Sequence, residues 1–90
     1  STIKMIGTVL NLGARGILGT SISLWGIFTI QNTIMVKIGS QVGMMVGLVG
    51  SGMIIASGPI LLCVGFTGYD YLALKMALGG IGTNIFGWML

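Results

Sequence analysis

Charged side chains are so widely spaced in this chain that most of it consists of uncharged apolar stretches. The charged residues are Lys4, Arg15, Lys37, Asp70 and Lys75, and residues 16–36, 38–69 and 76–90 contain none. A transmembrane helix needs about 20 predominantly apolar residues. The first two stretches are therefore long enough to cross a membrane, and the third is marginal.

The scarcity of charge also excludes an ordinary soluble monomer. Charged residues make up 6% of the 90 residues, against about 25% in average soluble domains. A small domain buries only about 60% of the surface of its chain, and this chain has too few polar residues to cover the remainder. We expect it to lie in lipid, to bury its surface against copies of itself, or both.

The chain also lacks most of the residue types that catalysis and metal binding require. The chain has no His, and its only acidic residue is Asp70, so a general acid–base pair cannot be formed. Zinc and calcium sites need several ligands, which one Cys and one Asp do not provide. The apolar surroundings of Cys63 predict a buried, inert thiol, and four scattered basic residues do not make a basic face for duplex DNA. We therefore expect that the chain is not an enzyme and that it binds no cofactor.

The pattern of apolar residues predicts an all-α chain with one unit over residues 1–90. We expect a hairpin of two long apolar helices, a first from about residue 3 towards residue 30 and a second over 42–66, with a kink rather than a break at Pro59. The turn between them should fall within 31–41, either at the polar run 31–33 or at 37–41. In the second case the first helix continues and the turn is short. A third helical segment is expected over about 71–90.

Small residues recur at helical spacing in all three segments. Because residues four apart share a helix face, such rows allow two helix backbones to approach closely in an apolar medium. We expect these rows to serve contacts between copies of the chain in a helical assembly, with packing inside one hairpin as the alternative. The first segment has such a row between residues 16 and 26, and the rows of the later segments are Gly39, Gly43, Gly47 and Ser51, and then Gly79, Thr83 and Gly87.

Two of the basic residues are candidates for binding anionic groups. A Lys in the turn of a membrane hairpin can meet lipid head groups, which applies to Lys37, although a solvated loop residue explains it equally well. Arg15 lies next to an apolar stretch, where charges face protein, water or the membrane interface. Contacts with acyl chains are expected from large apolar or flexible side chains, namely those of Trp25, Phe28, Met44 and Met45.

Residues 17–66 resemble the conjugative pilins, that is, the F-type and T-type pilins of type IV secretion systems and the related archaeal pilins of DNA-import machines. The similarity lies in the order of an apolar helix, a turn with a basic residue, and a Gly- and Met-rich helix that includes VGMMVGLVGSGMII at 42–55. The chain departs from these pilins in having one basic residue in the turn and a third apolar segment.

The resemblance implies a subunit that waits in the cell membrane and polymerises into a hollow extracellular pilus with bound phospholipid. By the same resemblance, the basic turn with Lys37 faces the lumen, the cargo is single-stranded DNA, and the partners are further copies of the chain and secretion or import machinery. Ser1 is then expected to be a processed end.

Three other classes share some of these features. A small holin-like pore-former has the same size and small-residue rows, and an accessory subunit of a membrane complex has the same apolar character. A ring subunit of a rotary ATPase needs an ionisable carboxylate in mid-membrane, and Asp70 lies instead at the boundary of an apolar stretch.

Overall fold

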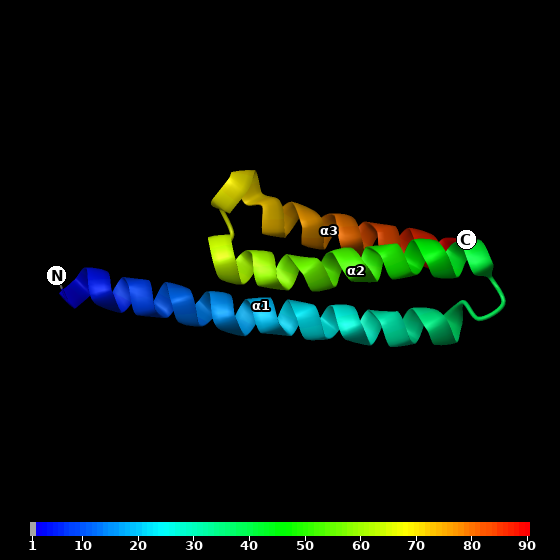
Figure 1. Cartoon of the computed structure of the whole chain (residues 1–90), viewed down its shortest axis with the longest axis horizontal. Helices are drawn as coiled ribbons and strands as arrows, with labels where there is room; N and C mark the ends of the chain where they lie inside the picture. Colours follow the sequence, from blue (N-terminus) through cyan, green and yellow to red (C-terminus); the bar gives the residue numbers. More distant parts are fainter. Residues whose placement is uncertain (1) are drawn as a thin grey trace.

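The computed structural model describes residues 2–90, which form three α-helices (Figure 1). They are α1 (Thr2–Val36), α2 (Gln41–Val64) and α3 (Gly68–Met89). The predicted all-helical fold with a third carboxy-terminal helix is confirmed, whereas the expected processing at Ser1 falls outside the described residues. Of the helices in the described part, α2 is the one that is both long and apolar enough to cross a membrane.

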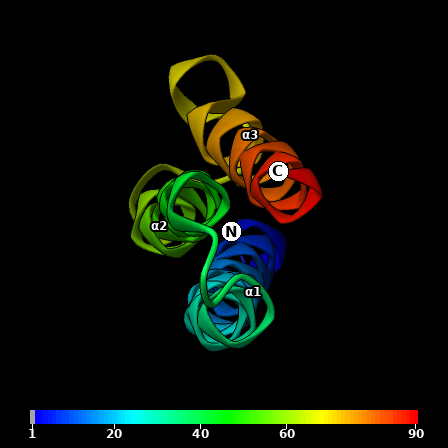
Figure 2. The same ribbon diagram turned by 90° about the vertical axis from the view of Figure 1, so that its right-hand side faces the viewer.

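The helices run alongside one another in a slender molecule of 58 × 22 × 14 Å. Helix α2 packs along both of the others, while α1 and α3 meet at few points. Seen end-on, the three helices occupy the corners of a triangle rather than a single row (Figure 2). This arrangement leaves α2 as the shared partner on which the other two helices are aligned.

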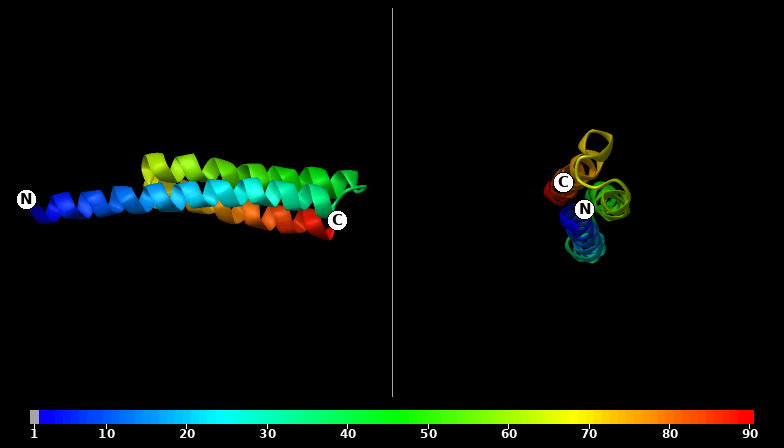
Figure 3. Two further views of the ribbon diagram at one scale, coloured as in Figure 1. Left: turned by 90° about the horizontal axis from the view of Figure 1, so that it is seen from below. Right: turned by 90° about the vertical axis from the view of Figure 1, so that its left-hand side faces the viewer.

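The amino-terminal part of α1 has no partner helix. Residues 2–14 extend beyond the ends of α2 and α3 (Figures 1 and 3), and each of them is exposed. At a rise of 1.5 Å per residue, this arm projects about 20 Å. We refer to residues 2–14 as the arm and to the rest of the three helices as the body.

The turn between α1 and α2 lies at residues 37–40, within the predicted interval but not at its polar run. The prediction of a turn at 31–33 is wrong, because α1 continues through these residues and Thr33 is completely buried. Thr33 faces the interior of the body, whereas Gln31 is exposed and Asn32 is half-buried. The turn is closed by Lys37 N–H donating to Thr33 O at 2.9 Å and by Gly39 with φ +92°, a conformation that glycine adopts without strain.

Pro59 neither ends nor breaks α2, in agreement with the prediction. A proline lacks the N–H that would bond to the carbonyl four residues earlier, which here is that of Ile55. The hydroxyl of Ser23 on α1 donates to Ile55 O at 3.1 Å. A neighbouring helix thus supplies the donor that Pro59 withholds. The helix ends at Gly65, whose φ is +75° and whose N–H donates to Leu61 O.

The corner between α2 and α3 contains consecutive left-handed residues. Tyr69, Asp70 and Tyr71 have φ values of 50°, 57° and 64°. For residues other than glycine this conformation costs roughly 1–2 kcal/mol each, and Tyr69 is 77% exposed, so little burial offsets the cost. Regular right-handed geometry in α3 begins only after this corner.

Candidate functional site

The distribution of side chains in this structure is the reverse of that in a soluble protein. The buried apolar side chains are few, namely those of Ile54, Leu61 and Ala73, while Thr, Ser and Asn side chains are buried between the helices. Large apolar residues on all three helices point outwards. The interior is therefore built from glycine backbone and hydrogen-bonded polar groups, and the outside is apolar.

Helices α2 and α3 approach each other backbone to backbone. A Cβ placed on Gly50 would lie 2.5 Å from Gly80 O, and one on Gly87 would lie 2.6 Å from Gly47 Cα and 2.8 Å from Gly43 O. Real Cβ atoms do not come that close to backbone atoms. Any side chain at these positions would therefore push α3 away from α2.

The contact between α1 and α2 is built in the same way. A Cβ on Gly19 would lie 2.8 Å from Gly58 O, and one on Gly58 would lie 2.5 Å from Gly19 O and would overlap the hydroxyl of Ser23. Gly26 faces the backbone of Ile55, because a Cβ built on Gly26 would lie 2.8 Å from the N atom of Ile55. Helix α2 thus presents a row of glycines to α3, whereas the close contact with α1 is made by Gly58 of α2 and by Gly19 and Gly26 of α1.

The small-residue rows lie largely within one chain, which is the alternative considered for them in place of contacts between copies. Gly43, Gly47 and Gly87 lie between helices of one chain, as does the buried Ser51. Gly39 belongs to the turn and not to α2, because its positive φ ends the row. Gly79 and Thr83 are half-buried at the edge of the α2–α3 contact, where Thr83 Oγ1 donates to Gly79 O at 2.7 Å.

A polar centre, formed by Thr29, Thr33, Ser51, Asn84 and Trp88, joins all three helices at the level of these glycines. Asn84 Nδ2 lies 2.9 Å from Thr33 Oγ1, 2.8 Å from Gly47 O and 3.0 Å from Ser51 Oγ. The indole Nε1 of Trp88 donates to Thr33 Oγ1 at 2.9 Å, and Thr29 Oγ1 lies 2.8 Å from Ser51 Oγ. Because Thr29, Thr33, Ser51 and Asn84 are buried and share hydrogen bonds, the centre fixes the register of the helices.

Of the polar centre, the sequence analysis identified Ser51 alone, as part of a small-residue row. The missed signal was the spacing of Thr29 and Thr33, four residues apart on one face of α1, together with the single Asn in the last apolar stretch. Polar residues inside apolar helices mostly face other helices. That rule predicts their burial, but it does not identify their partners.

A groove of about 260 Å³ runs between α1 and α3 beside the polar centre. Two of the predicted acyl-chain contacts, Trp25 and Phe28, line it, whereas Met44 and Met45 do not. Met45 is instead exposed on α2 and Met44 is half-buried. The remaining lining residues are Thr29, Asn32, Ile54, Ile81, Asn84, Ile85 and Trp88.

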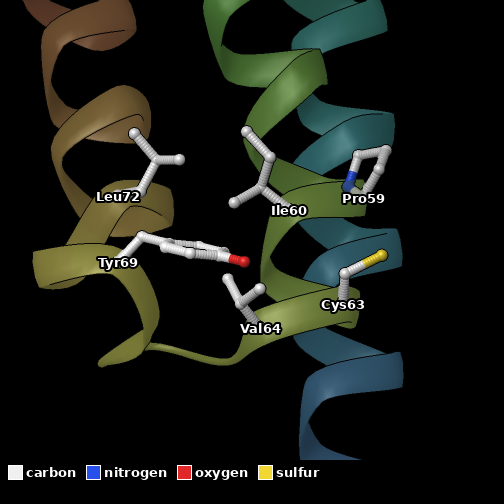
Figure 4. Close-up of a pocket in the computed structure, with 6 residues that line it drawn as sticks. All are labelled: Pro59, Ile60, Cys63, Val64, Tyr69 and Leu72. Carbon is white, nitrogen blue, oxygen red and sulfur yellow. The ribbon is translucent and has the colours of Figure 1, made fainter.

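A second hollow of about 230 Å³ lies at the opposite end of the body, under the α2–α3 corner (Figure 4). The ring of Tyr69 lies across from Ile60 and Val64, and Cys63 lies on the far side next to Pro59. The prediction of a buried Cys63 is wrong, because its thiol is exposed on the outward face of α2. Its apolar sequence neighbours reflect an apolar exterior and not a core.

The two candidate anion-binding residues lie at opposite ends of the body. Lys37 lies in the α1–α2 turn, half-buried, with its Cε 2.9 Å from a Cβ built on Gly43. Arg15 lies against Gly65 at the end of α2, 3.2 Å from a Cβ built there, and its Nε is enclosed without a hydrogen-bond partner. A cation at the carboxyl end of a helix interacts favourably with the helix dipole. Lys37 and Arg15 therefore do not form one site.

The chain was compared with protein-family models, curated proteins and solved structures, and no match was found.

Proposed function

We propose that this chain is a structural subunit that resides in the cell membrane and polymerises into a hollow extracellular pilus with bound phospholipid, of the kind used for DNA transfer. The placement in a membrane is supported by the distribution of side chains, which is the reverse of that in a soluble protein. Glycine and hydrogen-bonded polar groups are inside, and large apolar side chains cover the outside of each helix. Such a surface is stable among acyl chains or against other apolar subunits, but not in water.

The positions of the charges support the same placement. Arg15 and Lys37 are at opposite ends of the body. Residues 16–36 of α1 lie between them, so the two positions are separated by a rise of about 33 Å. This length is close to the hydrocarbon thickness of a bilayer, about 30 Å. Each end of the body thus carries a basic residue that can meet a lipid phosphate, while α2, the helix long and apolar enough to cross a membrane, spans the membrane core between them.

Two features favour assembly over a free-standing membrane subunit. The arm is a helix of exposed and mainly apolar residues that neither α2 nor α3 covers, and the rest of the apolar surface surrounds the body instead of forming one patch. A subunit with apolar surface on every side can make different contacts with several neighbours, and such contacts are the condition for an open helical polymer. In the pilus, we place Lys37 at the lumen, where lipid phosphates reduce its attraction for single-stranded DNA.

Microscopy of the assembled native protein tests the proposal directly. We expect long hollow filaments by negative staining, and about one phospholipid per subunit by extraction and mass spectrometry. The matched variants are Lys37→Glu, which reverses charge at the proposed lumen, and Lys75→Glu, which makes the same change on α3. Lys37→Glu should lower the phospholipid content of the filaments, and Lys75→Glu should leave it unchanged.

A pore-former and an accessory subunit of a membrane complex would each give a different result in these experiments. Rings or membrane patches in place of filaments would indicate a pore-former, and co-purification with fixed partners without self-assembly would indicate an accessory subunit. Filaments that contain no phospholipid would contradict the lipid part of the proposal and leave the structural role intact.

A further inference from the structure

The groove between α1 and α3 combines an apolar wall with a deeply placed polar atom. Trp25, Phe28 and Ile85 are exposed along its rim, and Asn84, at 5% exposure, forms part of its floor. Because α1 and α3 meet at few points elsewhere, the groove opens to the outside of the body. Whatever fills it comes from the medium that surrounds the apolar exterior.

The amide of Asn84 is only half used by the polar centre. All of its hydrogen bonds pass through Nδ2, including the one to Gly47 O. A main-chain carbonyl only accepts, so this contact fixes which end of the amide is the NH2 group. The side-chain oxygen Oδ1 accepts no hydrogen bond from residues 2–90, although the residue as a whole is nine-tenths buried.

An unpaired carbonyl at the floor of an apolar groove selects for a ligand with a donor. The apolar residues of the wall have none to offer, and a plain acyl chain also has none. A hydroxyl group attached to an apolar chain satisfies both parts of the groove at once, since the chain covers the aromatic side chains while the hydroxyl donates to the amide oxygen. Asn32, half-buried on the same groove, adds a second polar group beside it.

We propose that the groove binds the hydroxyl end of an amphiphilic lipid, with the hydroxyl donating to Asn84 Oδ1 and the attached chain lying against Trp25 and Phe28. The cavity of about 260 Å³ accommodates the hydroxyl and the first part of such a chain. The site lies within one chain, so it is separate from lipid held between copies. It relies on the proposed function only for placing the chain among lipids and does not require a filament.

The two tryptophans of the chain both line the groove, which provides a direct readout. The purified chain in a detergent without hydroxyl groups, such as an amine oxide, is titrated with 4-bromododecan-1-ol, whose bromine lies in the first part of the chain, or with its methyl ether, and quenching of tryptophan fluorescence by bromine is followed. We expect the alcohol to half-saturate at about tenfold lower mole fraction than the ether, because a tenfold ratio is what one net hydrogen bond of about 1.4 kcal/mol supplies.

A pair of variants on α3 separates binding in the groove from general partitioning. Ile81→Phe adds volume inside the groove and should abolish saturable quenching by the alcohol, while Leu78→Phe, an exposed position outside it, should leave the titration unchanged. Equal quenching by alcohol and ether would overturn the proposal, and so would an unaltered titration of Ile81→Phe. Filament formation is scored separately, so failure of this site and failure of the proposed pilus are distinguishable.

Discussion

Two parts of this molecule use glycine-rich apolar helices in opposite ways. Between α2 and α3, glycines are surrounded by backbone atoms of the facing helix, and a Cβ on Gly80 would lie 2.7 Å from Gly50 O. Along the arm, a Cβ on Gly7 or Gly13 would meet no atom within 4 Å. The same residue type therefore marks a completed contact in one region and an open surface in the other.

This difference teaches that a glycine row alone does not tell which helices meet. Glycine in a helix costs about 1 kcal/mol relative to alanine, and between α2 and α3 the close packing of backbones offsets that cost. In the arm nothing in the chain does so. The comparison can be tested by asking whether substitutions destabilise the α2–α3 contact and leave the stability of the body nearly unchanged when they are made in the arm.

The largest effect is expected from a side chain placed in the α2–α3 contact. Gly87→Ala would put a methyl group against Gly47 and Gly43 O, and overpacking of this kind costs about 1–3 kcal/mol or more. The control is Gly82→Ala on the same helix, where a Cβ meets nothing within 4 Å. Thermal unfolding in detergent, followed by circular dichroism, should show a clear loss for Gly87→Ala and an equal or slightly higher melting temperature for Gly82→Ala.

The next effect concerns the polar centre, which the arm lacks. Ser51→Ala removes an acceptor of Asn84 and a partner of Thr29, and unpaired buried groups cost about 1–3 kcal/mol. Ser21→Ala is the matched control, because Ser21 is exposed and bonds only to a carbonyl of its own helix. Chemical denaturation should give a lower free energy of unfolding for Ser51→Ala alone. Equal values for both variants would show that the centre adds little to stability.

The sequence sufficed for the number of helices and for the type of contact between them, but not for which residues face which helix. Four-residue spacing selects Gly79 and Thr83 as readily as Gly80 and Asn84, which are the ones that are buried. The choice depends on the rotation of α3, which the polar centre determines through hydrogen bonds between residues 33 to 55 apart in sequence. A polar run at 31–33 is as typical of a turn as of a helix with one polar residue turned inwards, so the burial of Thr33 was not predictable from local pattern.

A smaller effect is expected where α1 compensates for Pro59. Ser23→Ala removes the donor to Ile55 O and should destabilise the body by about 1 kcal/mol. In a Pro59→Ala background the helix regains its own N–H, so the same Ser23→Ala substitution should cost less. A double-mutant cycle in detergent measures the difference, and a coupling energy of zero would mean that Ile55 O does not depend on Ser23.

The smallest effect on unfolding is expected from a substitution in the arm, and it provides the clearest test of the difference between the arm glycines and those between α2 and α3. Gly7→Leu adds a large side chain where no atom lies within 4 Å, so the free energy of unfolding of the body should change by less than about 0.5 kcal/mol. The same substitution should impair filament formation. In the proposed pilus a neighbouring subunit covers the arm, and a bulky residue weakens a close contact between helices. We therefore expect Gly7→Leu to fold as the wild type does in detergent and to give fewer or shorter filaments by electron microscopy. Filaments of normal length and number would show that Gly7 stays uncovered in the assembly, and a large loss of stability in detergent would show that the arm already has a partner in the single chain.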